Sequence, residues 1–255
     1  MAGAIDMSRV SWPDVAEALE RGVIAVLAVG AVEQHGAHLP LTTDADLAHG
    51  VARRIADGLG ALLLPPVAYG DAWNNEAFPG TLSISPETLR AVLEDIGRGL
   101  IRMNVEALVL VNGHFGNREP IALAARTLTG QGLPVLHLDY PRLEALAVQI
   151  CESEPAGSGF YHADEVETAM MLALRPQAVD MSRAAAEYPE FPVTFGHEPM
   201  QLREFNTTGV FGDPRPATAG KGEALIAGIV EASLQLVEAF RLRHKGHEVT
   251  DGNAQ

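Results

Sequence analysis

Residues 33–44 read Glu-Gln-His-Gly-Ala-His-Leu-Pro-Leu-Thr-Thr-Asp and follow the apolar run 23–29, Val-Ile-Ala-Val-Leu-Ala-Val. The apolar run is typical of a buried strand. The stretch after it contains four side chains that commonly bind metal: Glu33, His35, His38 and Asp44. Open α/β sheets gather ligands at the carboxyl ends of their strands, and carboxylates with imidazoles suit Zn²⁺, Mn²⁺ or Fe²⁺. The segment therefore predicts an α/β fold with a metal site at one end of its sheet.

Strand and helix patterns alternate along the chain. Further buried strands are predicted at residues 61–64, 107–111 and 134–138, and amphipathic helices at 47–59, 85–103, 121–129, 164–174 and 223–240. Strands separated by helices predict parallel pairing, and nearly continuous apolar strands predict helices on both faces of the sheet. Residues 187–218, rich in Pro, Gly and Phe, are expected to form an ordered loop region. We interpret residues 1–255 as one domain with a frayed tail at 244–255.

The composition excludes several classes of partner. The 255 residues carry a formal net charge of −15 and no cluster of Lys and Arg, so no nucleic-acid partner is expected. No apolar run approaches the ~18 residues that cross a bilayer, and the N-terminus does not resemble a signal peptide. Cys151 is the only cysteine, which fits a reducing compartment. We therefore expect a cytoplasmic protein with no membrane partner.

Two further polar segments are candidates for the same site. Residues 112–117, Asn-Gly-His-Phe-Gly-Asn, follow another predicted strand, so His114 is expected to point from a strand end into the same crevice. Residues 162–168, His-Ala-Asp-Glu-Val-Glu-Thr, open a predicted helix. Glu165 and Glu167 cannot share one face of a regular helix, so at most one of them is expected to reach the site.

Each of these segments also has a purely structural interpretation. Asp44 is suited to capping the helix that follows it, and acidic residues in a first turn stabilise the helix dipole. A lone histidine after a strand, such as His114, is often a hydrogen-bonded core residue. His38 fits either support of the ligands or simple packing. The coincidence of three polar segments, two of them at strand ends, favours a metal site over these alternatives.

At these residues the chain resembles the creatininase (creatinine amidohydrolase) family. The matching stretches are residues 30–44, 78–83, 112–117, 162–168, 209–214 and 217–219. The resemblance implies a three-layer α/β sandwich with a mostly parallel central sheet, two divalent metal ions (Zn²⁺, Mn²⁺ or Fe²⁺) and a homo-oligomer, often a hexamer. It also implies that a metal-bound hydroxide cleaves the C–N bond of a small-molecule amide, such as a cyclic amide, lactam or formamide.

The resemblance assigns roles to individual residues. It implies metal ligands at four positions, with Asp44 bridging the two ions: Glu33, His35, Asp44 and His114. A further ligand of creatininase is a glutamate at the position of Gly116, and here Glu167 is expected to replace it, with Glu165 as the alternative. His162 matches a histidine placed near the substrate in relatives, and either His162 or Glu167 is expected to carry the proton to the leaving nitrogen.

The residues expected around the ions do not identify the substrate. Six residues are expected to line the substrate pocket: Trp73, Asn74, Asn75, Phe115, Phe160 and Tyr161. Four are expected to support the ligands from behind: His38, Asn112, Asn117 and Glu165. The tryptophans that cover creatinine in relatives have no evident match, so creatinine is not singled out. The alternatives are a peptidase of a short modified peptide, as in mycofactocin-type members of the family, and a non-catalytic metal-binding or ligand-binding protein.

Overall fold

A parallel sheet brings the ends of the central strands to one edge. In the computed structural model, which describes residues 3–248, five strands pair in parallel in the order β1-β3-β2-β4-β5. Their bounds are Ile5–Asp6 (β1), Ala25–Val29 (β2), Leu62–Leu63 (β3), Leu108–Asn112 (β4) and Val135–Leu138 (β5). Val29 of β2 lies opposite Asn112 of β4. The segments that leave these two strands therefore start side by side.

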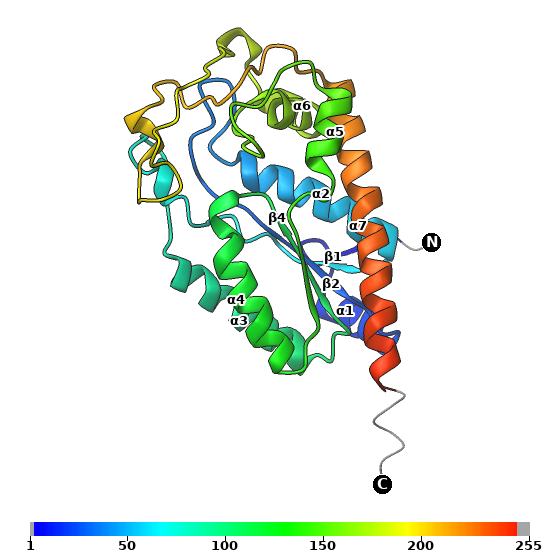
Figure 1. The fold of residues 1–255 in the computed structure, drawn as a ribbon. Helices are drawn as coiled ribbons and strands as arrows, with labels where there is room; N and C mark the ends of the chain where they lie inside the picture. The colour runs from blue at the N-terminus through cyan, green and yellow to red at the C-terminus, as the bar shows by residue number, and fades with distance from the viewer. Residues whose placement is uncertain (1–2, 249–255) are drawn as a thin grey trace.

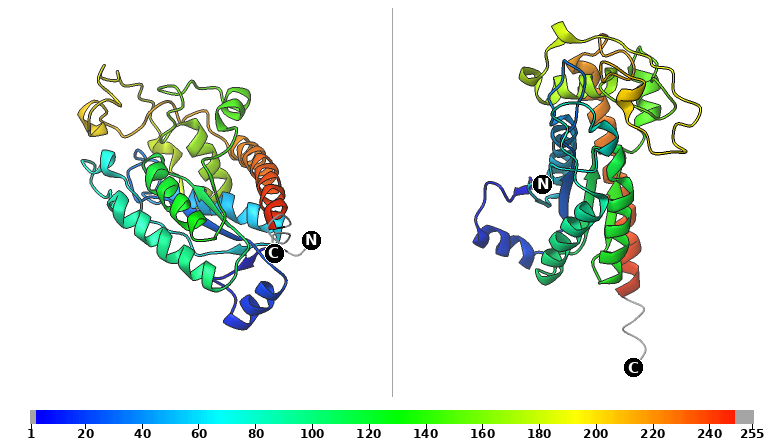
Figure 2. Two further views of the ribbon diagram at one scale, coloured as in Figure 1. Left: turned by 60° about the horizontal axis from the view of Figure 1, so that its bottom comes forward. Right: turned by 90° about the vertical axis from the view of Figure 1, so that its left-hand side faces the viewer.

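Helices cover both faces of this sheet (Figure 1). The α-helices are Trp12–Glu20 (α1), Thr43–Leu59 (α2), Pro86–Arg102 (α3), Arg118–Gly130 (α4), Leu143–Ile150 (α5), Glu165–Leu174 (α6) and Ala219–Glu248 (α7). Short 3-10 turns span Trp73–Asn75 (η1), Phe115–Asn117 (η2), Pro176–Ala178 (η3), Met181–Arg183 (η4) and Leu202–Glu204 (η5). Helices α3 and α4 lie on one side of the strands, and α2 and the long α7 lie on the other (Figures 1 and 2).

Alternate residues of the strands point into two separate cores. In β2, Leu27 and Val29 pack with residues of α1, α3 and α4, whereas Val26 and Ala28 pack with residues of α2, α6 and α7. All four are fully buried. Each buried Val or Leu contributes about 1.5–3 kcal/mol, which explains why the strand is apolar on both faces. The predicted three-layer sandwich with a parallel central sheet is confirmed.

The predicted strands and helices are present, with shifts of a few residues at most ends. The largest shift is in the last helix, because α7 begins at Ala219 and continues to Glu248. The first residues of the tail expected to fray are therefore helical, and residues 249–255 lie outside those described. Within residues 3–248, none of the helices is both long and apolar enough to cross a membrane.

One strand and two α-helices were not predicted from the sequence. Strand β1 is only two residues long, and α5 follows Arg142, whose left-handed φ of 66° and lack of a side-chain cap give no helix-start signal. Helix α1 did carry a signal, since Ser11, Pro13 and Asp14 repeat the residue types that begin α3.

The irregular region 187–218 lies at the end of the molecule near α6 (Figure 1). Antiparallel bridges join Glu187 to Gly212 and Phe211 to His162. Five of the eight phenylalanines meet here, with ring centroids 4.9–6.1 Å apart: Phe160, Phe191, Phe195, Phe205 and Phe211. The region is therefore an ordered loop, as predicted, although it has little regular secondary structure.

Candidate metal centre

Polar side chains from four elements meet at the carboxyl edge of the sheet. Strand β2 leads into Glu33 and His35, and β4 leads into His114. Asp44 lies in the first turn of α2, and Glu167 lies in the first turn of α6. Four of these residues are buried, and the side chain of His114 is 10% exposed. The structure therefore brings together the five residues that were expected to hold metal.

Glu33, Asp44 and His114 form one group of donors. His114 Nδ1 lies 3.1 Å from a carboxylate oxygen of Glu33 and 3.1 Å from one of Asp44. Its other ring nitrogen, Nε2, lies 2.8 Å from the backbone oxygen of Asp71 and must donate to it, because a carbonyl oxygen only accepts. A neutral His114 therefore turns its Nδ1 lone pair toward the two carboxylates, which is how a metal-binding histidine is usually held.

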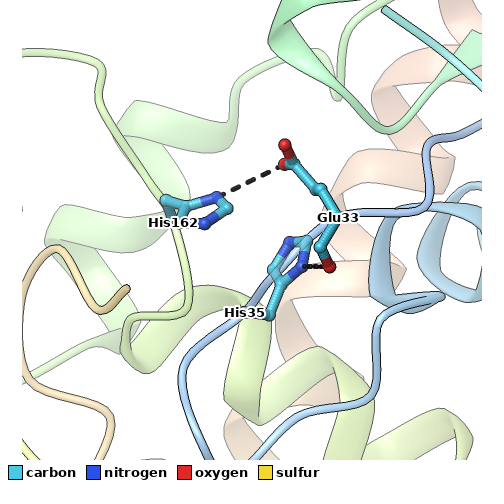
Figure 3. A group of neighbouring side chains, drawn as sticks. All are labelled: Glu33, His35 and His162. Carbon is cyan, nitrogen blue, oxygen red and sulfur yellow. Dashed lines mark hydrogen bonds and ion pairs between the residues drawn. The ribbon is translucent and has the colours of Figure 1, made fainter. Parts of the chain in front are cut away.

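His35, Asp44 and Glu167 form a second group. His35 Nε2 lies 3.0 Å from Asp44 Oδ1 and 3.5 Å from Glu167 Oε2, while its Nδ1 lies 3.2 Å from the backbone oxygen of Glu33 (Figure 3). Asp44 belongs to both groups, because its Oδ2 faces His114. Despite these short distances, neither His35 Nε2 nor Asp44 Oδ2 has the geometry of a hydrogen bond to any of the described residues. Buried polar atoms are normally paired, so these atoms indicate a place for cations.

Burial and the carboxylates act in opposite directions on the histidines. Burial alone would lower the pKa of His35, but Asp44 and Glu167 raise it to about 10. The pKa of His114 is also raised well above its ordinary value, because Glu33 and Asp44 outweigh burial. Burial and the Asp44 charge raise the pKa of Glu167 to about 8, against the effect of His35. Near neutral pH the cluster therefore holds protons, which a bound metal ion would displace.

A chain of hydrogen bonds fixes His162, which lies just before α6. Asn75 Nδ2 donates to Glu33 Oε2 at 2.7 Å, and Asn75 Oδ1 accepts from Gln34 Nε2 at 3.1 Å. Because Gln34 Oε1 accepts from the backbone N–H of Gly36, the Gln34 amide nitrogen faces His162 Nε2, at 2.7 Å. An amide nitrogen donates, so His162 Nε2 accepts and the network assigns the ring proton to Nδ1.

The protonated Nδ1 of His162 faces the donor groups. It lies 3.6 Å from Glu33 Oε1, and the imidazole lies 4.4 Å from that of His35, centroid to centroid (Figure 3). Burial and the His35 charge lower the pKa of His162 to about 4, so the ring is neutral near pH 7. His162 is thus a neutral N–H donor beside the cluster.

The backbone before α6 decides which glutamate reaches the cluster. Ala163 adopts a left-handed φ of 53°, and its N–H donates to Glu167 Oε2 at 2.6 Å. The Asp164 side chain accepts from the Glu167 N–H and caps the helix. Glu165 faces the other way, toward Lys221 and two backbone N–H groups. The expectation that Glu165 supports the site is therefore wrong, because α6 turns its side chain away.

The turn after β4 positions His114 and leaves no room for another ligand. Asn112 Oδ1 accepts from the backbone N–H of His114, at 3.1 Å. Asn117 Oδ1 accepts a hydrogen bond from the backbone N–H of Asp71. The backbone carbonyl of Asp71 in turn accepts the hydrogen bond from His114 Nε2. A Cβ on Gly116 would lie 2.0 Å from that carbonyl. The additional glutamate of creatininase therefore cannot be accommodated at Gly116 without moving the support of His114.

A cavity of about 280 Å³ adjoins the cluster. Five residues at its base come from the donor groups and the network beside them: Glu33, Asp44, His114, His162 and Glu167. Five of the residues expected to contact substrate also line it: Asn74, Asn75, Phe115, Phe160 and Tyr161. The cavity therefore gives a substrate access to both donor groups and to the His162 N–H.

Two other predicted residues lie away from the donor groups. Trp73 does not line the cavity and is 40% exposed, so that prediction is wrong. Successive side chains of a 3-10 turn point about 120° apart, and in η1 the inward positions belong to the two asparagines. His38 is buried and pairs through Nε2 with Thr168 Oγ1 of α6 at 2.9 Å. It therefore fastens the segment after β2 to the helix that carries Glu167.

Sequence reasoning missed five residues of the site: Gln34, Tyr140, Phe195, Met200 and Leu202. Gln34 had a signal, since it stands between two predicted ligands. Gly209 makes room for it, because a Cβ there would lie 1.7 Å from Gln34 Oε1. The buried Tyr140 hydroxyl has no hydrogen-bond partner in the described part of the chain and lines a second cavity of about 90 Å³. The other three lie in the irregular region, which has no periodic pattern.

Comparison with known proteins agrees with the geometry. A sequence model of the creatininase family, described as creatinine amidohydrolase, matches residues 8–237. The creatinine amidohydrolase of Pseudomonas putida is 29% identical over 247 residues, covering 91% of this chain and 95% of that protein. A mycofactocin precursor peptide peptidase of Mycobacterium ulcerans is 32% identical over 232 residues, covering 87% of this chain and 83% of that protein.

Solved structures extend the comparison to the fold. A mutant creatininase described as Zn–Zn type has a TM-score of 0.80 to this chain at 29% identity. The match covers 94% of this chain and 99% of the creatininase chain. The sequence similarity and the arrangement of layers therefore both extend over nearly the whole length. The chain belongs to the creatininase family of hydrolases.

Proposed function

We propose that this protein is a metal-dependent amidohydrolase that cleaves the C–N bond of a small amide. The observation that carries the proposal is the pair of three-donor groups that share Asp44 beside a cavity. Glu33 and His114 would complete the site of one divalent ion. His35 and Glu167 would complete the site of the other. Mixed carboxylate and imidazole donors suit Zn²⁺, Mn²⁺ or Fe²⁺.

Divalent ions bound in these groups would supply Lewis-acid chemistry, which polarises an amide carbonyl and acidifies water. The residues of the chain orient the reacting groups. In the overall reaction, the oxygen of water bonds to the carbonyl carbon, the electron pair of the C–N bond leaves with nitrogen, and one proton of the water passes to that nitrogen. The neutral His162 presents Nδ1–H in the cavity and can donate a hydrogen bond from it to the reacting amide. Gln34 holds His162 in the tautomer that can donate.

Metal analysis and turnover measured on one preparation test the proposal. We expect about two ions per chain after metal-replete expression and hydrolysis of at least one lactam, cyclic amide or formamide. Asp44→Asn should lose both properties, because Asp44 belongs to both donor groups. Asp46→Asn is the matched control, since Asp46 lies in the same turn of α2 but pairs with Arg175. Full ion content and turnover in Asp44→Asn would refute the proposed site.

Cleavage of a short modified peptide is the second candidate, favoured by the similarity to a mycofactocin precursor peptide peptidase. The bond broken is also a C–N amide bond, so the same donor groups would serve. A panel that adds short peptides to the small amides separates the two candidates. Turnover of peptides alone would select the peptidase. Stoichiometric ion binding without turnover of either class would favour a non-catalytic binding protein.

A further inference from the structure

The wall of the larger cavity is apolar away from the donor groups. It is lined by six side chains: Phe115, Phe160, Tyr161, Phe195, Met200 and Leu202. Among the described residues, Glu198 is the only charged side chain that lines this wall. The guanidinium of Arg118 lies 4.3 Å from the centre of the Phe115 ring, but it is already paired with Asp139 at 2.9 Å and is not free to compensate an anion there. An anionic group would meet carboxylates without a compensating cation, whereas an uncharged apolar group would meet a matching surface.

Two rings of the wall are held in place from behind. Phe195 lies 4.9 Å from Phe191 and 5.6 Å from Phe205, and Phe160 lies 4.9 Å from Phe211, measured between ring centroids. Phe211 is fully buried. Edge-to-face and tilted aromatic pairs each contribute about 0.5–1.5 kcal/mol beyond the area they bury. Phe160 and Phe195 therefore present a largely preformed surface.

The aromatic wall is joined directly to the reacting end of the cavity. The backbone N–H of Phe211 donates to the carbonyl of His162 at 3.0 Å, and Phe160 stands two residues before His162. The cavity volume of about 280 Å³ lies near the lower end of the roughly 300–1,000 Å³ typical of small-molecule sites. This space accommodates an amide together with a ring-sized substituent.

We propose that this wall is a subsite for the apolar part of the substrate. The substrate is then an uncharged amide with an aromatic ring or bulky aliphatic group next to the scissile C–N bond. The inference rests on the proposed function and extends it by naming the class of amide. Phosphorylated and carboxylated amides are poor candidates, because the wall offers them no cation.

Hydroxamates test the subsite without turnover, because they bind divalent ions and carry different substituents. Calorimetry on the Zn²⁺-loaded protein should show benzohydroxamate binding about tenfold more tightly than acetohydroxamate. The 4-carboxylate of benzohydroxamate should lose this advantage. Phe195→Ala should reduce the ratio to about twofold and leave acetohydroxamate unchanged. Val193→Ala is the matched control, since Val193 is fully exposed in the same loop and does not line the cavity.

Benzamide is a second probe and needs no metal. Saturation-transfer NMR on the metal-free protein should detect binding of its ring and show a loss in Phe195→Ala. Phe195→Leu keeps apolar packing and should give an intermediate result, even if the alanine variant folds poorly. Benzamide binding without hydroxamate binding would support the subsite and contradict the proposed metal site. Equal affinity for the first two hydroxamates, an unchanged ratio in both Phe195 variants or preference for the carboxylated probe would overturn the subsite.

Discussion

Glu165 and Glu167 lie in the same turn of α6 and are both buried, yet their carboxylates are satisfied in opposite ways. Glu165 accepts from Lys221 Nζ at 2.5 Å and from two backbone N–H groups. Glu167 accepts from one backbone N–H and otherwise faces His35 and Asp44. The first carboxylate has a permanent cation, Lys221, built into the chain, whereas the second faces another carboxylate and His35, which is charged only while it holds a proton.

The pKa values of the two carboxyl groups shift in opposite directions. Burial would raise the pKa of Glu165, but Lys221 and the backbone N–H groups outweigh it and lower the pKa. Burial and Asp44 raise the pKa of Glu167 to about 8. A buried carboxylate with a fixed partner stabilises the fold, whereas one without such a partner is neutralised by a proton or by a cation from solution. The comparison teaches that burial alone does not distinguish a structural carboxylate from a metal-binding one.

Glu167→Gln should have the largest effect. Loss of one charged donor is expected to lower kcat/KM by about 10³-fold and to remove about one ion per chain. Glu165→Gln is the matched variant, because Glu165 lies two positions earlier in the same turn of α6 but faces the other way, and this variant should retain its ions. Elemental analysis and steady-state kinetics of both variants measure the difference. Equal ion loss in the two variants would remove the basis of the comparison.

Glu167→Gln should also change the stability of the metal-free protein. The folded-state pKa of Glu167, about 8, lies above its ordinary value of 4.5. A raised carboxylate pKa stabilises the fold below pH 4.5, and this contribution is lost as pH rises toward 8. Glutamine does not titrate, so Glu167→Gln should not lose stability in this pH range. The metal-free variant should therefore be at least as stable as the parent at pH 8. Urea unfolding in the presence of a chelator provides the measurement.

Lys221→Met should have the next largest effect, which is a loss in the free energy of unfolding. It leaves the Glu165 carboxylate buried without its cation, which is expected to cost about 3 kcal/mol. Glu152→Gln removes only an exposed contact of the same lysine and should cost less than about 0.5 kcal/mol. The double variant with Glu165→Gln should recover part of the loss, since no charge is then left unpaired. A purely additive double-mutant cycle would show that the pair is not coupled.

The sequence predicted which candidate ligands lie together better than it predicted the lining of the cavity. Glu33, Asp44 and His114 follow from topology, because parallel strands deliver their carboxyl ends to one edge. Periodicity alone left Glu165 and Glu167 open, since the choice depends on the left-handed backbone at Ala163. The family resemblance favoured Glu167, and the geometry agrees.

The aromatic wall illustrates what the sequence could not provide. Phe195, Met200 and Leu202 lie in a region without helical or strand periodicity, so no pattern indicates which side chains face inward. Trp73 was assigned to the pocket by residue type, but η1 places the two asparagines there instead. In such loops the direction of a side chain is set by distant packing, here by the phenylalanine cluster, rather than by neighbours in sequence.

The pH dependence of metal binding sharpens the comparison further. His35 and Glu167, with pKa values raised to about 10 and about 8, hold protons at neutral pH that a metal ion must displace. Apparent affinity should therefore rise with pH, by at least about tenfold per unit between pH 6 and 8. Competition with a chelator measures the slope. Glu165→Gln should keep the slope, and an affinity that is independent of pH would contradict the proton-filled cluster.

Thr168→Val should have the smallest effect, a modest loss of stability. Like Glu165 and Glu167, Thr168 is a buried polar residue near the start of α6. Thr168 Oγ1 pairs with His38 Nε2 at 2.9 Å, and burial together with His35 lowers the pKa of His38 to about 4. Both partners are therefore neutral near pH 7, and removing the hydroxyl leaves a buried ring nitrogen unpaired at a cost of about 1 kcal/mol. Thr168→Ser keeps the hydroxyl and should cost less. Because neither residue belongs to a donor group, urea unfolding should change while ion content stays constant, and a loss of ions in Thr168→Val would instead make His38 part of the metal centre.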